Sequence, residues 1–250
     1  MFFALVIILS WLMTTCGIFV FLTLSNTGIP AGYGRYSNPS GSSVSPRLGW
    51  MIQESPAFLI PAFFYFLTEI HTDFGEFLTV LMLIHYGYRT FIWPFLINSN
   101  NRIPVEIVAM ALGFCVWNGF IQGVWNARYQ PEYAEFHPKL LIYLGVAVFF
   151  TGFLIHIIHD YHLISLRSST VSYSIPRGLL FEFISCPNYF GECLEWIGYS
   201  LAARSFPAIA FAFFTVCNLA PRAMSHHKWY KERFGDKYPK ERKALIPGIW

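Results

Sequence analysis

The sequence predicts an all-α integral membrane protein with seven transmembrane helices, and two observations lead to this prediction. Hydrophobic residues make up 55% of the 250 residues and charged residues only 12%. The mean hydropathy is +0.45, which lies outside the range of soluble globular domains. Apolar runs also recur at lengths near the roughly 20 residues that cross a bilayer. They cover residues 2–24, 51–70, 78–97, 105–125, 140–158, 179–203 and 206–220.

The first of these runs is expected to remain in the protein as a membrane span. Residues 2–24 carry no charge, and the run lacks both a basic leader and a small-residue cleavage site after its apolar core. The loops between the seven runs are short, so no second, soluble domain fits. We therefore expect residues 1–250 to form a single membrane domain.

The distribution of charge predicts how the spans are oriented. Residues 222–250 hold eight Lys or Arg against three Asp or Glu, a net charge of +5, whereas the whole chain has only +3. Basic segments beside a span stay on the cytosolic side. The C-terminus is therefore predicted to be cytosolic and, with seven spans, the N-terminus lumenal. The serine-rich stretch 37–45, between Arg35 and Arg47, falls on the cytosolic side too.

Polar and ionisable side chains interrupt the apolar runs. Such groups are costly in hydrocarbon and usually face a bundle interior or a wet cavity, where they mark functional sites. Several of them together predict a polar chamber inside the helical bundle. They are Glu54, Tyr86, Arg89, Asp160, Asn188, Glu192 and Glu195.

Helical spacing groups some of these residues on common faces. Residues three, four or seven apart share one face of a helix, and Pro187 fits the first turn of the helix that follows it. Cations and carboxylates gathered on the cytosolic side predict a negatively charged, soluble cofactor. A basic amphipathic tail helix resting on anionic lipid is the alternative. The two groups are Asn188, Glu192 and Glu195, and Arg222, His226 and Tyr230.

No metal site is predicted. His156, His159 and His162 resemble part of a histidine box of the di-iron type, but such centres need about as many ligands as the eight histidines of this chain. His71, His85 and His137 lie in unrelated places along the sequence. The five cysteines form no C-x-x-C pair, and we expect them to be buried free thiols.

Six motifs in order resemble the steroid 5α-reductase (3-oxo-5α-steroid 4-dehydrogenase) family of membrane enzymes, from residue 32 to the C-terminus. They are W-x-x-Q-E at 50–54, H-Y-x-x-R-T-F at 85–91, N-G-x-x-Q-G at 118–123, S-Y-x-I-P at 172–176, N-x-x-G-E-x-x-E-W-I-G-Y at 188–199 and Y-P-K-x-R-K-A-L-I-P at 238–247. The resemblance implies NADPH, bound mainly by residues 140–250, and a steroid beside helices of residues 1–125. It also implies residence in the endoplasmic reticulum, with a lipophilic steroid and membrane lipid as partners, no nucleic acid, and a monomer.

The resemblance implies roles for particular residues. Glu54 and Tyr86 match the catalytic pair at the steroid 3-ketone. Cofactor contacts would be Tyr33, Asn98, Asp160, Arg167, Tyr173, Asn188, Glu192, Arg222, His226 and Tyr230. The steroid pocket would be lined by Trp50, Gln53, Phe114, Tyr189, Trp196, Phe211 and Phe214. Three positions depart from the family pattern: His156 replaces Asn, Ser174 replaces Arg, and Met110 replaces an Arg of one member. Arg177 could partly replace the cation missing at 174.

The chemistry of these residues agrees with reduction of a C4–C5 double bond conjugated to a C3 ketone. Hydride at C5 leaves negative charge on the C3 oxygen, and a protonated Glu54 and the Tyr86 phenol are suitable donors to it. The sequence leaves simpler readings open, a helix N-terminal carboxylate for Glu54 and an interfacial aromatic for Tyr86. Alternative functions are a polyprenol or enoyl-CoA reductase, a membrane methyltransferase using S-adenosylmethionine, and a non-enzymatic sterol binder.

Overall fold

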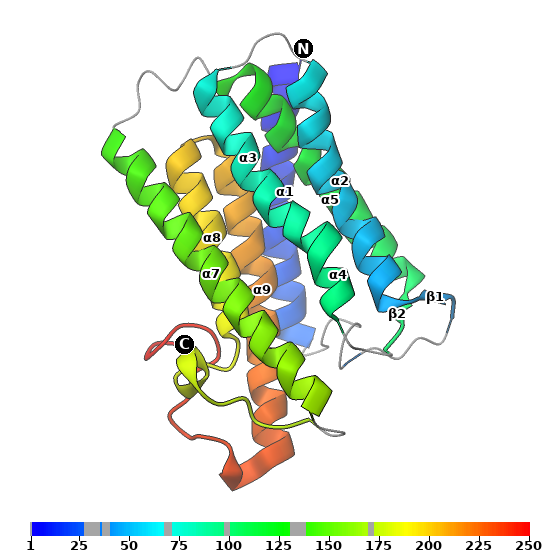
Figure 1. Ribbon diagram of the computed structural model, residues 1–250, viewed down its shortest axis with the longest axis vertical. Helices are drawn as coiled ribbons and strands as arrows, with labels where there is room; N and C mark the ends of the chain where they lie inside the picture. The colour runs from blue at the N-terminus through cyan, green and yellow to red at the C-terminus, as the bar shows by residue number, and fades with distance from the viewer. Residues whose placement is uncertain are drawn as a thin grey trace.

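The protein is a bundle of long helices, as shown by a computed structural model that describes residues 2–27, 36, 41–67, 72–97, 101–130, 139–169 and 173–250 (Figure 1). The side chains of residues 167–169 are outside this description. The long helices are α1 (Phe2–Thr27), α2 (Pro46–Leu67), α3 (Asp73–Gly87), α5 (Val105–Arg128), α7 (Lys139–Ser169), α8 (Pro187–Ala203) and α9 (Phe206–Phe234).

Shorter elements complete the described part of the chain. A π-helical turn, η2 (Tyr88–Ile92), continues α3 directly into α4 (Trp93–Leu96), so these three form one rod. Two short 3₁₀ turns, η3 (Leu179–Glu182) and η4 (Gly235–Lys237), precede α8 and follow α9. Strands β1 (Ser43–Val44) and β2 (Ile103–Pro104) pair antiparallel at one end of the bundle.

The predicted all-helical membrane class is confirmed in its main feature. Helices α1, α5, α7 and α9 are each long and apolar enough to cross a membrane. Large apolar side chains also cover much of the outer surface, as expected where lipid replaces water. Examples are Phe19, Phe66, Leu140 and Tyr143, all more than 65% exposed. The count of seven spans and the orientation of the termini stay predictions.

Several predicted boundaries were wrong. The sixth run, 179–203, becomes α-helical only at Pro187, whose fixed φ suits a first helical turn, and the 3₁₀ turn η3 precedes it. The fifth run does not end at 158: α7 continues to Ser169, so Asp160 lies inside the helix. The last span and the basic tail helix are one helix, α9, with Pro221 inside it. Helix α2 starts at Pro46, which places Glu54 more than two turns inside and removes the explanation by the helix dipole.

Close approach of α7 and α8 depends on glycines that line their contact. A Cβ atom added at any of them would collide with the backbone of the facing helix, so only glycine permits this spacing. The pairs, with the glycine first, are Gly145 and Ala202, Gly152 and Glu195, Gly191 and His156, and Gly198 and Phe149. This glycine seam brings the polar residues of α7 and α8 within contact distance.

Helix α5 meets α2 in the same way. A Cβ at Gly119 would lie 2.8 Å from the Pro56 carbonyl oxygen, and one at Gly123 would lie 2.9 Å from Pro61 Cα. These glycines come from the N-G-x-x-Q-G motif, and they turn one face of α5 toward α2.

The C-terminal segment folds back beside the start of α8. Ile184 and Lys243 form a parallel bridge, and the Ser185 amide donates to the Lys243 carbonyl at 2.8 Å. The Ser185 hydroxyl lies 2.6 Å from both His227 Nδ1 and the Tyr238 hydroxyl, and burial raises the pKa of the Tyr238 phenol. The segment therefore packs against the end of the bundle where α9 extends beyond its neighbours (Figure 1).

Candidate active site

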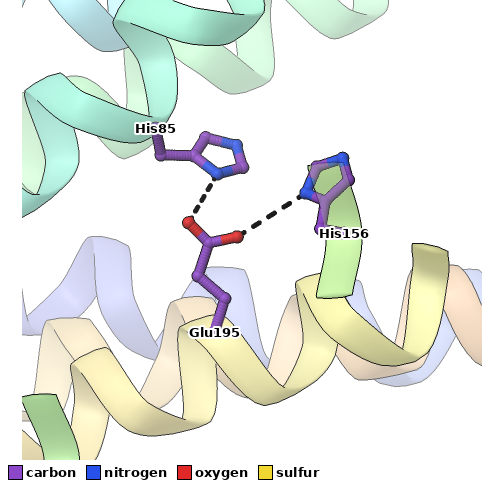
Figure 2. A group of neighbouring side chains, drawn as sticks. All are labelled: His85, His156 and Glu195. Atoms are coloured by element: carbon purple, nitrogen blue, oxygen red, sulfur yellow. Dashed lines mark hydrogen bonds and ion pairs between the residues drawn. The ribbon is translucent and has the colours of Figure 1, made fainter. Parts of the chain in front are cut away.

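Two histidines and a glutamate from three different helices meet in the middle of the bundle (Figure 2). His85 of α3 lies with Nδ1 2.8 Å from Glu195 Oε1 of α8, and His156 Nδ1 of α7 lies 3.6 Å from Glu195 Oε2. The three side chains are at most 2% exposed. Their ligand-capable atoms lie within 4.8 Å of one another, so the group could also hold a metal ion. The 2.8 Å contact has the length of a direct hydrogen bond.

The polar network continues along α7 and α8 from this triad. His156 Nε2 lies 3.0 Å from Asp160 Oδ2, and Asn188 Nδ2 donates to Asp160 Oδ1 at 2.9 Å. Glu192 Oε2 is 4.0 Å from His156 Nε2. Arg89, from the π-helical turn, lies 3.6 Å from Asp160 Oδ2. Arg89 thus provides a positive charge beside a buried group of carboxylates, and the two histidines add hydrogen-bonding nitrogens to the same group.

Arg89 also connects this network to the aromatic side chain predicted at one wall of the steroid pocket. Its guanidinium carbon lies 4.4 Å from the centre of the Trp50 ring and 5.2 Å from that of Trp93. A cation over an aromatic face is attracted by the ring quadrupole. Trp50 therefore sits beside the polar network rather than on the outer surface of the bundle.

Helix α5 brings the predicted catalytic pair into one region. The Cys115 thiol lies 3.7 Å from Glu54 Oε2, and Asn118, one turn further along α5, donates to the Tyr86 hydroxyl at 3.2 Å. Gln53 donates to Glu54 Oε1 at 3.1 Å. Tyr86 is only 4% exposed, so the reading of this residue as an interfacial aromatic does not fit.

Most of the predicted steroid-pocket aromatics form one continuous group next to Tyr86. The Trp196 ring centre lies 5.8 Å from that of Tyr86 and 4.4 Å from that of Phe211. Phe114 stacks on Phe214 with centres 4.4 Å apart and lies 6.2 Å from Phe211. These rings come from α5, α8 and α9 and form an apolar wall beside a phenol.

The remaining predicted residues lie near the extended end of α9. The Tyr189 hydroxyl is 3.3 Å from His226 Nε2. Tyr189 therefore lies with the residues at this end of α9, apart from the other predicted pocket aromatics. Tyr230 stacks on Tyr238 at 5.5 Å. Tyr173 packs against Trp229 and is 39% exposed. The shared face of Arg222, His226 and Tyr230 on one helix agrees with the prediction from spacing.

Three predicted cofactor residues cannot be located in this way. Tyr33 and Asn98 lie outside the residues that the structure describes, and so does the side chain of Arg167. Arg177, suggested as a substitute for the cation missing at 174, forms an exposed ion pair with Glu182 at 3.7 Å.

Sequence reasoning assigned no catalytic or cofactor role to four residues of the network. His85 was set apart as an unrelated histidine, yet its ring centre lies 5.7 Å from that of His156. Glu195 was named among the residues of the polar chamber and placed on the correct helical face, but it was given no catalytic or cofactor role. Asn118 and Gln122 belong to a recognised motif that carried no assigned role. For His85, the available signals were its adjacency to Tyr86 and its place at the start of the H-Y-x-x-R-T-F motif.

Apolar helices around a buried network of ionisable side chains define a helical membrane protein with an enzyme-like polar interior. Comparison with known proteins identifies the family to which this membrane protein is similar. A model of the family described as 3-oxo-5-alpha-steroid 4-dehydrogenase matches residues 101–250, and the chain belongs to this family. The six motifs had predicted the same family.

Similar proteins match over most of their length. The protein 3-oxo-5-alpha-steroid 4-dehydrogenase 1 of Macaca fascicularis is 39% identical over 229 residues, covering 87% of this chain and 84% of its own. The corresponding enzyme 2 of Sus scrofa is 42% identical over 229 residues, with 88% and 89% covered. Steroid 5-alpha-reductase DET2 of Solanum lycopersicum is 37% identical over 224 residues, with 87% of each chain covered.

Proposed function

We propose that this protein reduces the C4–C5 double bond of 3-oxo-Δ4 steroids to give 5α-steroids, with NADPH as the hydride source. The observation that carries the proposal is the buried Tyr86 phenol beside the Trp196 ring. Helix α5 contacts both members of the predicted catalytic pair, Tyr86 through Asn118 and Glu54 through Cys115. The names of the similar proteins, which include 3-oxo-5-alpha-steroid 4-dehydrogenases of animals and a steroid 5-alpha-reductase of a plant, support the same reaction.

The reaction requires donors at the oxygen where negative charge develops. NADPH, when bound, would supply hydride to C5, and protonation at C4 then restores the C3 ketone and completes the reduction. Tyr86 donates a hydrogen bond to the steroid C3 oxygen, as does Glu54 if its carboxyl carries a proton, and these bonds stabilise the charge most in the transition state. The aromatic wall of Trp196, Phe211 and Phe114 excludes water and holds the apolar ring system.

The residues toward the extended end of α9 have the chemistry that a dinucleotide needs. Asp160, Asn188 and Glu192 would bind its ribose and amide groups, and Arg222 and His226 its phosphates. The buried Arg242 guanidinium is a further observation in favour of anion binding at this end. It is 2% exposed, and its Nε and Nη2 have no hydrogen-bond partner among the described residues.

Replacing Arg222 by alanine is expected to weaken NADPH binding by about 1–3 kcal/mol, the usual effect of removing a charged hydrogen-bond partner. The Michaelis constant for NADPH should rise about 5- to 140-fold, because 1.4 kcal/mol corresponds to a factor of ten, while that for steroid changes little. Arg233→Ala removes an exposed charge from the same helix and serves as the control. Unchanged NADPH affinity in Arg222→Ala would contradict the assignment of Arg222.

For the orientation, we propose seven spans in the endoplasmic reticulum membrane, with the N-terminus lumenal and the protein a monomer. The N-terminus and the C-terminal segment lie toward opposite ends of the bundle, which supports an odd number of spans (Figure 1). Glycosylation tags placed after residue 250 and within residues 41–45 should stay unmodified in microsomes, and a tag before residue 2 should be modified. A glycosylated C-terminal tag would put the cofactor residues in the wrong compartment.

The proposed reaction is tested directly by NADPH oxidation with purified protein. Testosterone or progesterone should support oxidation and yield the 5α-reduced product, whereas a polyprenol should not. Activity with the polyprenol alone would favour the related reductase reaction. Steroid binding without NADPH oxidation would favour a non-enzymatic sterol binder.

A further inference from the structure

We propose that Asn118 and Gln122 are positioning residues that fix the direction of the Tyr86 hydroxyl, so that its proton is available to the substrate. The inference rests on the proposed function and deepens it. It assigns a role to the polar residues of the N-G-x-x-Q-G motif. Both side chains are buried, Asn118 contacts Tyr86, and Gln122 contacts Asn118.

The direction of this hydrogen-bond chain starts at a main-chain carbonyl. The carbonyl oxygen of Pro207, at the beginning of α9, lies 2.9 Å from the Gln122 side-chain amide. A carbonyl oxygen can only accept, so the NH₂ group of Gln122 must face it. The opposite amide orientation would place two oxygens against each other and leave the NH₂ group without this acceptor. The backbone of α9 therefore determines which way Gln122 points.

Gln122 in turn orients Asn118. Gln122 Nε2 also lies 3.4 Å from Asn118 Oδ1, so the Asn118 oxygen faces Gln122. The Asn118 NH₂ group then faces Tyr86 and donates to its hydroxyl oxygen at 3.2 Å. Tyr86 is an acceptor in this contact. Its own proton must point elsewhere, and no acceptor for it occurs among the described residues.

This arrangement suits a hydroxyl that must donate to a developing oxyanion. A donor that is already oriented needs no reorganisation when charge develops. Accepting a bond from Asn118 also polarises the phenol and strengthens it as a donor in a low-dielectric interior. Asn118 and Gln122 are both 0% exposed, so water does not compete for these groups.

The glycines of the same motif hold helix α5, and with it the hydrogen-bond chain through Gln122 and Asn118, in position. Gly119 and Gly123 allow α5 to pack directly on the α2 backbone, and this contact fixes the rotation of α5 about its axis. Asn118 and Gln122 point away from that face, toward Tyr86 and the start of α9. The motif therefore combines two polar positions that orient a donor with two glycines that hold their helix.

Three variants test the proposal in the full-length protein with NADPH and a Δ4-3-oxosteroid. Asn118→Leu keeps the branching of the side chain but removes the donor to Tyr86. It should lower kcat about tenfold with little change in KM, less than the 10²–10³ expected for losing an oxyanion donor outright. Asn126→Leu is the matched control, since Asn126 on the same helix donates to the Tyr199 hydroxyl at 3.0 Å. It should leave kcat near the unsubstituted value.

Asn118→Asp is the most direct test, because it can reverse the direction of the hydrogen bond between residue 118 and the Tyr86 hydroxyl. Once the introduced carboxyl ionises it can only accept, so it takes the Tyr86 proton away from the substrate. Its activity should fall as pH rises, toward that of Tyr86→Phe, and recover at low pH where the carboxyl can still donate. Asn118→Leu should lack this additional pH dependence. Identical pH profiles and losses in the two variants would overturn the proposal.

The stretching frequency of the bound steroid carbonyl, labelled with ¹³C at C3, distinguishes the donor role of Tyr86 from the positioning role of Asn118. Donation from Tyr86 lowers this frequency, so Tyr86→Phe and ionised Asn118→Asp should both raise it. If Tyr86→Phe leaves it unchanged, the donor role of Tyr86 in the proposed function fails. If Tyr86→Phe raises it and Asn118→Asp does not, only the positioning role of Asn118 fails.

Discussion

Tyr86→Phe is expected to fold and bind NADPH normally yet lose about 10²–10³ in kcat, the usual effect of removing one oxyanion donor. The hydroxyl is buried and accepts a bond from Asn118. In the proposed reaction it donates to the developing oxyanion, so its loss acts on transition-state charge more than on ground-state binding. Single-turnover reduction of a Δ4-3-oxosteroid measures the chemical step.

Tyr199→Phe provides the matched control for this change. Tyr199 is a fully buried phenol that also accepts from an asparagine of α5, Asn126, so both substitutions leave one amide donor unpaired. Only Tyr86→Phe should reduce kcat strongly. A near-normal kcat for Tyr86→Phe would remove Tyr86 from the reaction.

Glu54 extends the same test to the second donor. Glu54→Gln keeps the volume and can still donate through its amide, so it should retain more activity than Glu54→Leu. Because Glu54 and Tyr86 serve one oxygen, the double variant should lose less than the product of the single losses. Independent, multiplicative losses would mean that the two residues act on different atoms.

Gly152→Ala is expected to have the largest effect on stability. The added Cβ would collide with the Glu195 backbone, and no side-chain rotation can relieve a collision with main chain. Overpacking costs about 1–3 kcal/mol, occasionally more, and here α7 and α8 must also separate. The midpoint of thermal unfolding in detergent should fall by several degrees or more, together with loss of steroid reduction.

Gly113→Ala is the control for the glycine prediction. It makes the same change in a helix, α5, but nothing lies within 4 Å of the added Cβ. Alanine is favoured over glycine in a helix by about 1 kcal/mol, so stability should stay the same or rise. Equal behaviour of the two variants would show that the α7–α8 glycine seam does not control packing.

The sequence by itself determined the features that depend on local composition and helical period. Its apolar composition predicted membrane helices, and the spacing of Asn188, Glu192 and Glu195 placed them correctly on one face of α8. The motifs predicted the family that the comparisons then established. Each of these follows from residues within one segment, where 3.6 residues per turn fixes which side chains are neighbours.

Only the tertiary structure decided which helical faces meet. His85 and Glu195 are 110 residues apart, and Asn118 and Tyr86 are 32 apart, yet each pair is hydrogen-bonded. Helical period cannot predict such pairs, because it says nothing about the rotation of one helix against another. That rotation is set by close backbone contacts at the glycines of α5, α7 and α8. The continuation of α7 past residue 158 likewise depends on polar partners for Asp160 that come from α8 and η2.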